Sequence, residues 1–287
     1  MTTVKTSSVI FQQDPCFPLR VAYETQEPTC FHSHEFVEIV IILNGKGEHR
    51  TSFSSHVVSK GDILIIPRNG VHCYQEVEGL ELINVLSEPR RLPLPLLDLY
   101  QLPAYHALFE LENSFFESKR FYPSFHPDGV RLSRIQMFLR EMQRESTEKK
   151  PGYRCCLLGY FVLLLGTLCR LFDASGLKQS QLPFWNIGKV MGYLNANYHK
   201  KISLDDILAH VPMSKSAFLR HFKKASGYSP VEYLIKIRIG KAAALLKTQK
   251  NSISDTAHQC GFTDSNYFTR CFTKIMGSSP SDYRKEA

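Results

Sequence analysis

The sequence predicts an α+β protein with a β-rich N-terminal part and an all-α C-terminal part. Three observations give this fold class. Short β-branched segments separated by turn residues run through residues 9–86, apolar helical patterns fill residues 130–172, and a helical unit occurs twice in the last hundred residues. The chain has 287 residues, which suits two domains, and its 43% of hydrophobic residues is ordinary for a globular protein.

The predicted strands alternate with turns at a spacing typical of a sandwich or barrel. Asn44-Gly45 is the strongest turn signal, because Asn-Gly favours a two-residue hairpin. We therefore expect a long strand before this dipeptide and a returning strand after it. The expected strands are residues 31–43, 47–53, 63–66, 71–75 and 80–86.

Polar side chains gather on one face of the first expected strand. His32, His34 and Glu38 are separated by even numbers of residues, so on one continuous strand they point the same way. With His72 they form a set of three imidazoles and a carboxylate. Such a set suits Zn, Fe, Mn or Ni, and its members can also hydrogen-bond a polyol or one another.

This pattern resembles the two cupin motifs. The first is His-x-His followed by Glu38 and Gly45, and the second is Gly61-x5-Pro ending in His72. The resemblance implies a β-barrel, and in metal-binding cupins these positions hold the metal. A ligand contact, a metal site and a purely structural role all stay open. We assign His32, His34, Glu38 and His72 to contacts with a small ligand and expect no bound metal and no cofactor.

Two helices are expected between residues 130 and 172, separated by Lys149-Lys150-Pro151-Gly152. Such a hairpin can pair two copies of the chain, or it can simply pack on the barrel. Its second helix contains an 18-residue apolar run, 155–172, at the threshold for a membrane span. Two glycines and Arg170 within the run argue for a buried helix instead. We expect a sensing domain at 1–130, a dimerisation hairpin at 131–172, a linker at 173–185 and a DNA-binding domain at 186–287.

The eight cysteines have no metal-like or redox spacing, which predicts reduced thiols. Residues 1–15 contain one lysine and no apolar core, so we expect no signal peptide and a cytoplasmic protein.

The last hundred residues contain a duplicated unit. The sixteen residues from Phe218 to Tyr233 recur from Phe268 to Tyr283 with eight identities at a constant offset of 50. Each copy has the layout of a helix-turn-helix. A short helix and a turn lead to an N-cap residue, and a longer helix then buries two phenylalanines four residues apart.

The outward residues of the longer helices suit DNA. Arginine grips guanine through two hydrogen bonds, asparagine does the same to adenine, and leucine contacts a thymine methyl. Residues 186–287 carry 16 Lys and Arg against 7 Asp and Glu, so the positive charge of the chain lies in this half. The expected DNA contacts are Ser214, Lys215, Ser216, Leu219, Arg220 and Lys223 in the first unit, and Ser265, Asn266, Thr269, Arg270 and Lys274 in the second.

Residues 202–284 resemble the AraC/XylS family of bacterial transcription regulators. The most specific part is the run from Cys260 to Arg270, Cys-Gly-Phe-Thr-Asp-Ser-Asn-Tyr-Phe-Thr-Arg. The resemblance implies that the two longer helices enter successive major grooves on one face of the DNA. Pro212 departs from the family pattern, which commonly has glycine in this first turn. A weaker resemblance of residues 30–170 to the rhamnose-responsive branch of these regulators implies a carbohydrate ligand.

The sequence therefore predicts a sequence-specific DNA-binding transcription regulator, an activator, that responds to a sugar. The expected partners are double-stranded promoter DNA, a carbohydrate effector, a second copy of the chain and RNA polymerase, with no membrane and no catalytic residue. One alternative is a cupin metal-dependent enzyme with an appended DNA-binding domain. Another is a DNA-binding protein that responds to no small molecule.

Overall fold

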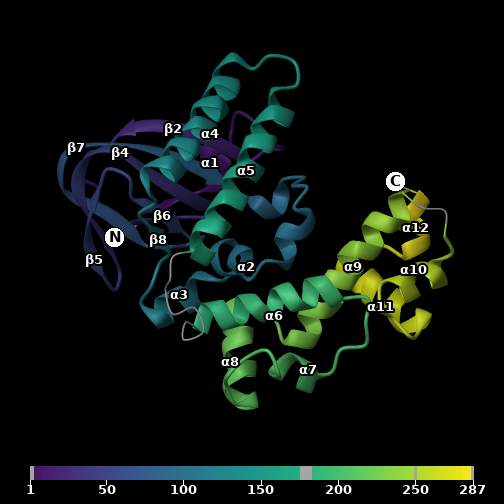
Figure 1. Ribbon diagram of the computed structural model, residues 1–287. Helices are drawn as coiled ribbons and strands as arrows, with labels where there is room; N and C mark the ends of the chain where they lie inside the picture. The colour runs from purple at the N-terminus through teal and green to yellow at the C-terminus, as the bar shows by residue number, and fades with distance from the viewer. Residues whose placement is uncertain (1–2, 175–182, 249–250, 286–287) are drawn as a thin grey trace.

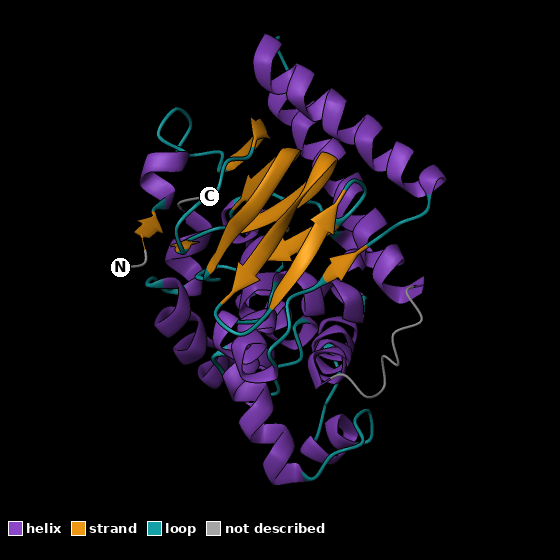
Figure 2. Ribbon diagram, turned by 90° about the vertical axis from the view of Figure 1, so that its left-hand side faces the viewer, coloured by secondary structure: helices purple, strands orange, loops and turns teal. Residues whose placement is uncertain are grey.

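The computed structural model describes residues 3–174, 183–248 and 251–285. Its N-terminal half is a cupin-like barrel made from one bent sheet, and its C-terminal half is all helical (Figure 1). Figure 2 shows the long strands of the sheet with a helical hairpin alongside them. The α+β fold class predicted from the sequence is confirmed.

Two long strands form the centre of the sheet. β4 and β7 pair in antiparallel fashion, and β2, β3, β5 and β6 pair with one or the other. The strands of the described ranges are β1 Thr3–Lys5, β2 Leu19–Thr25, β3 His32–His34, β4 Val37–Thr51, β5 Ser55–Ser59, β6 Ile63–Ile66, β7 His72–Ser87 and β8 Ser124–Phe125.

The expected hairpin at Asn44-Gly45 was wrong. β4 runs straight through this dipeptide, and the pairing of β4 with β7 shifts register on either side of Asn44. Gly45 has φ +73°, and a Cβ there would collide with the backbone of Gly79 on β7. The glycine therefore serves a bulged bend where two strands cross closely, rather than a chain reversal. The strands expected at 71–75 and 80–86 are likewise two parts of the single strand β7.

The continuous first strand was also wrong. The chain leaves the sheet at residues 35–36, so His32 and His34 lie on β3 and Glu38 lies on β4. The backbone N–H of Asn69 donates to the carbonyl of His34 at 2.7 Å, outside the ladder. The break turns His34 back toward Glu38, and parity along one strand is not what brings them together.

Helices cover the outer face of the sheet, where Ile39, Ile41, Ile63 and Ile65 belong to the same apolar core as α4 and α5. α4 and α5 form the expected hairpin. The helical segments of this half are α1 Ser7–Ile10, η1 Pro89–Arg91, η2 Leu97–Gln101, α2 Pro103–Phe109, α3 Asn113–Lys119, α4 Gly129–Glu148 and α5 Tyr153–Ala174.

The C-terminal half contains two helix-turn-helix units joined by the long helix α9. α6 precedes them and crosses below the barrel in Figure 1. The linker expected at 173–185 falls mostly on residues 175–182, which lie outside the described residues. The helices are α6 Pro183–Asn197, α7 Leu204–Leu208, α8 Lys215–Ser226, α9 Pro230–Thr248, α10 Ile253–Gln259, α11 Ser265–Met276 and α12 Pro280–Lys285.

The two halves share one apolar core. α6 packs on α2 and η2, and Phe184, Ile187 and Val190 of α6 are buried with residues of the barrel and hairpin. Gly188 and Gly192 make the approach close, because a Cβ on either would collide with the backbone of η2 or α2. The sensor half and the DNA-binding half are therefore in direct contact through backbone surfaces.

Candidate functional site

The two longer helices of the duplicated units begin with the caps that the sequence predicted. The Ser214 hydroxyl accepts from the backbone N–H of Ala217, at the start of α8. The Asp264 carboxylate accepts from the N–H groups of Asn266 and Tyr267, at the start of α11. Both helices end at a left-handed glycine, Gly227 or Gly277. α8 and α11 are thus the same structural element twice.

The duplication extends to the aromatic packing under each helix. The rings of Phe218 and Phe222 lie 5.5 Å apart, and those of Phe268 and Phe272 lie 5.6 Å apart. Each second phenylalanine meets a tyrosine edge-on, at 5.6 Å in the first unit and 5.4 Å in the second. The eight identities at offset 50 therefore reflect one repeated packing arrangement.

Most of the expected DNA contacts are exposed on these helices. Three residues are only half-exposed: Leu219, Ser265 and Thr269. Leu219 packs against the core, and the Thr269 hydroxyl donates to the carbonyl of Ser265 at 2.9 Å. The methyl group of Thr269 is therefore freer to meet DNA than its hydroxyl. The exposed set is Ser214, Lys215, Ser216, Arg220, Lys223, Asn266, Arg270 and Lys274.

A groove of about 620 Å³ between α9 and α11 was missed by the sequence reasoning. Arg270 and Lys274 line it from the recognition helix α11. From α9, Lys236 donates to the Tyr228 hydroxyl at 2.6 Å and lies 3.8 Å from the centre of its ring. The sequence signal was available, since Lys236 is a basic residue near the start of the helix that joins the two units.

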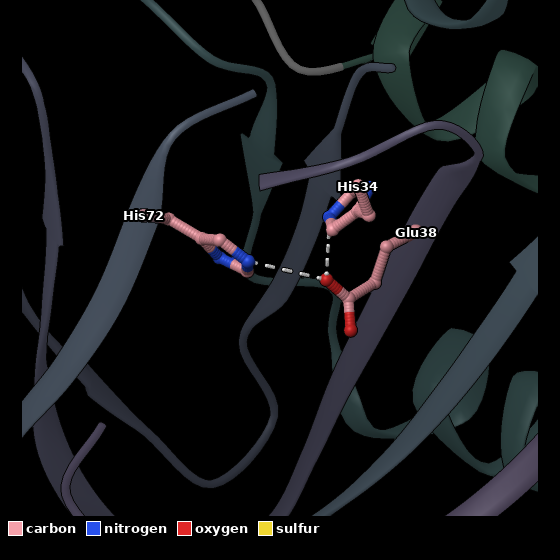
Figure 3. A group of neighbouring side chains, drawn as sticks. All are labelled: His34, Glu38 and His72. Carbon is pink, nitrogen blue, oxygen red and sulfur yellow. Dashed lines mark ion pairs between the residues drawn. The ribbon is translucent and has the colours of Figure 1, made fainter. Parts of the chain in front are cut away.

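The polar cluster of the barrel is real but differently composed. The Nε2 atom of His34 lies 3.0 Å from Oε2 of Glu38, and Nε2 of His72 lies 3.5 Å from the same oxygen (Figure 3). These three residues come from β3, β4 and β7 and are at least 93% buried. Within the described ranges they form the one group of His, Cys, Asp or Glu side chains close enough to share a metal ion.

His32 stands beside this group rather than in it. Its Nδ1 faces the carbonyl of Cys30 at 3.1 Å, and its ring lies 4.4 Å from that of His72. His49 of β4, which the sequence reasoning missed, lies behind His72, with Nε2 at 3.2 Å from Nδ1 of His72. No motif marks His49, because a bend of the sheet, not local spacing, brings it there.

Burial governs the ionisation of the cluster. Desolvation alone would raise the pKa of Glu38, but the hydrogen bond from His34 and attraction to His34 and His72 outweigh it and hold the pKa at about 2. Burial, followed by repulsion from His56, lowers the pKa of His49 to about 3. Burial also lowers the pKa of His72. A carboxylate thus lies among imidazoles that resist taking up protons.

A second contact joins the sensor to the first recognition helix. The backbone N–H of Glu112 donates to the carbonyl of Ala225 near the end of α8, at 2.8 Å. The Phe115 ring of α3 meets the His221 ring of α8 edge-on at 6.2 Å. Burial, and then the charges of Lys119, Arg220 and Lys224, lower the pKa of His221. A shift of α3 would therefore be felt by α8 directly.

Comparison with known proteins agrees with this division. A model described as an AraC-like ligand binding domain matches residues 20–154, and one described as a helix-turn-helix domain matches residues 207–286. The HTH-type transcriptional activator RhaR of Mannheimia succiniciproducens is 27% identical over 259 residues, which cover 90% of this chain and 88% of the relative. The protein of that name from Escherichia coli O1:K1 is 26% identical, over 88% of this chain and 86% of the relative.

Among solved structures, the DNA-binding domain of AdpA in complex with a target DNA is 29% identical. The match covers 35% of this chain and 91% of that one, with a TM-score of 0.34.

A cupin-like domain in contact with two helix-turn-helix units defines a DNA-binding transcription regulator with a sensor domain. Both family models bear the same assignment across the chain. The chain belongs to the AraC-type transcription regulators.

One helix, α5, is long and apolar enough to cross a membrane by length and composition alone, and 44% of its most apolar 18-residue window is buried. Leu157, Phe161, Leu164 and Leu168 of α5 belong to the core shared with α4 and the sheet. This packing favours the core-helix interpretation made from the sequence.

Proposed function

We propose that this regulator is a cytoplasmic activator of transcription that responds to a small carbohydrate bound in the barrel. The observation that carries the proposal is the buried polar cluster of the barrel, in a domain that packs directly on the DNA-binding half. The weaker resemblance to rhamnose-responsive regulators supports a sugar, and the names of the relatives support activation.

Polar atoms without hydrogen-bond partners supply the chemistry for a polyol. The side chains of His34, His49, His72, Tyr74 and Asn84 each have a buried nitrogen or oxygen that lacks such a partner. Leaving buried polar atoms unpaired costs about 1–3 kcal/mol each. Sugar hydroxyls both donate and accept, so one sugar can satisfy several of these atoms at once. His32, His34, Glu38 and His72 stay our proposed ligand contacts, with His49, Tyr74 and Asn84 added.

The route to DNA runs through two packed surfaces. α2 lies against α6, and α3 lies against α8. A ligand that shifts the barrel relative to these helices changes the position of α8, and its differential affinity for the two arrangements sets the size of the response. We assign Arg220 and Arg270 to base contacts, and Lys223 and Lys274 to phosphates.

The hairpin of α4 and α5 is our proposed surface for a second copy of the chain. Val130 and Met137 of α4 and Leu163 of α5 expose 83%, 50% and 48% of their surface. Pairing two copies places four recognition helices on one promoter. RNA polymerase is the further partner that activation requires.

The alternative of a cupin enzyme is less favoured, because the relatives named above are regulators across nearly their whole length. The DNA-binding protein without an effector is less favoured because of the unpaired polar atoms in the barrel.

The test is a thermal-shift screen of the full-length protein against monosaccharides, followed by measurement of promoter binding with each hit. A ligand that binds only the folded state raises the unfolding midpoint. We expect one sugar class to raise the midpoint and to change DNA affinity. If no monosaccharide does either at millimolar concentration, the proposed effector class is wrong.

A further inference from the structure

The three atoms that converge in the barrel are spaced like the ligands of one metal ion. His34 Nε2, Glu38 Oε2 and His72 Nε2 all lie within 4.8 Å of one another, and two of the separations are 3.0 and 3.5 Å. A tetrahedral ion with ligands at about 2.0–2.2 Å holds its ligand atoms about 3.3–3.6 Å apart. The three side chains therefore need little movement to bind an ion between them.

Hydrogen bonding fixes which nitrogen of His34 faces the carboxylate. Its Nδ1 lies 2.7 Å from the backbone carbonyl of Phe36, and a carbonyl oxygen can only accept, so Nδ1 carries a hydrogen. A neutral His34 then has a bare lone pair on Nε2, which faces the oxygen of Glu38 at 3.0 Å. Two acceptors at this distance require a cation between them.

A proton can be that cation, but it would leave His72 unexplained. A proton shared by His34 and Glu38 joins two atoms, and the Nε2 atom of His72 also points at the same oxygen without a hydrogen-bond partner. The other nitrogen of His72 is held by His49 at 3.2 Å. Metal-bound histidines commonly have their second nitrogen held in this way by a carbonyl or a neighbouring side chain. A metal ion accounts for all three atoms together.

We propose that His34, Glu38 and His72 bind one divalent first-row transition-metal ion, with His49 orienting His72. Two imidazoles and one carboxylate suit Zn²⁺ and Fe²⁺ in particular. His32 lies outside the ligand set, because its Nδ1 is directed at Cys30 and its ring stacks on His72. The geometry thus reverses our sequence-based expectation of no metal and replaces the four-residue set with three residues.

The ion would link three strands that the chain joins only at distant points. β3, β4 and β7 each supply one ligand, so binding ties the barrel wall together and adds to its stability. Three protein ligands leave at least one coordination position open. The proposal does not depend on a sugar effector, since the ligand atoms and their hydrogen bonds come from the protein alone.

The test is reconstitution of the full-length protein. The protein is stripped with a chelator, reloaded with Zn²⁺ or Co²⁺, desalted and analysed for metal content, with the unfolding midpoint measured in parallel. We expect one equivalent per chain and a midpoint that rises on reloading. Glu38→Gln and His34→Gln should each weaken metal binding by at least tenfold. His56→Gln, a matched change at an exposed histidine of β5, should leave binding unchanged.

The Co²⁺ spectrum separates this site from the cysteines. Thiolate ligands add an intense charge-transfer band that a site of two imidazoles and a carboxylate lacks. The proposal is overturned if the wild-type protein retains no metal after reloading, or if the bound Co²⁺ shows the thiolate band. It is also overturned if folded Glu38→Gln binds metal as tightly as the wild type. A protein that binds sugar without binding metal would overturn this inference and leave the proposed function standing.

Discussion

Gly188 of α6 lies so close to Pro103 of α2 that a Cβ on the glycine would collide with the proline carbonyl oxygen. Gly192, one turn later, stands in the same relation to the carbonyl of Gln101. The first helix of the DNA-binding half therefore rests backbone to backbone on the segment that follows the barrel. This contact gives the two halves a defined relation that the sequence between them does not reveal.

Gly188→Ala should separate α6 from α2 and destabilise the protein. Overpacking of a tight contact costs about 1–3 kcal/mol, and a backbone oxygen cannot rotate away as a side chain can. Thermal unfolding of the full-length variant should show a lower midpoint than the wild type.

Gly240→Ala is the matched control, because Gly240 lies in helix α9 and a Cβ there meets nothing within 4 Å. Alanine in place of an exposed helical glycine should stabilise by about 0.5–1 kcal/mol. Equal midpoints for the two variants would show that the contact between α6 and α2 is not tight in solution.

His106 predicts a loss of stability in acid. This residue of α2 is fully buried, and its ring lies 2.7 Å from the carbonyl of Tyr100. Burial lowers its pKa to about 4, although the bond to Tyr100 acts in the opposite direction. The unfolded chain, with a pKa near 6.5, takes up the proton first. Stability is therefore complete above pH 6.5 and decreases as the pH falls toward 4, by up to about 3 kcal/mol.

His106→Gln should flatten this part of the pH profile, measured as the free energy of unfolding in urea between pH 7 and 4. His49 and His72 have lowered pKa values too, and they remain in the variant. The difference between wild type and variant isolates His106. A difference that does not change with pH would contradict the account.

How much of this could be predicted from the sequence depended on whether the determinant was local. The caps Ser214 and Asp264 were predictable, because a cap contacts backbone two or three residues away. The repeated phenylalanines were predictable because an offset of 50 preserves helical phase. Gly188 and Gly192 were not, since their role depends on a partner segment about 85 residues earlier in the chain.

The barrel site was predicted in part for the same reason. His34, Glu38 and His72 carry a recognisable spacing and were assigned correctly to one place. The supposed reason was wrong, because the strand breaks at residues 35–36. His49 reaches His72 across the register of β4 and β7, whose bulges near Asn44 no spacing rule anticipates.

Lys223 and Lys274 should contribute affinity without sequence preference. Each is exposed in the last turn of its recognition helix and suited to a phosphate. Removing one phosphate contact should reduce the slope of log affinity against log salt by about one. Titration of Lys223→Gln and Lys274→Gln with operator and unrelated DNA over a range of salt measures this.

Lys60→Gln removes the same charge from an exposed turn of the barrel and serves as the control. If Lys60→Gln lowers the salt slope as much as Lys274→Gln does, net charge rather than a defined contact explains the effect. If Lys274→Gln weakens operator binding but not binding to unrelated DNA, our phosphate assignment is wrong.

The central claim is that two equivalent helices read two separate major grooves, and base preference measures this most directly. Operators are first selected from random DNA with the full-length protein, and wild type, Arg220→Ala and Arg270→Ala are then titrated against every single-base variant. Each substitution should cost about 1–3 kcal/mol and abolish preference at its own base position. The two positions should lie about one helical turn, 10–10.5 base pairs, apart. Loss of preference at the same base pair for both variants, or at none, would contradict the two-groove account.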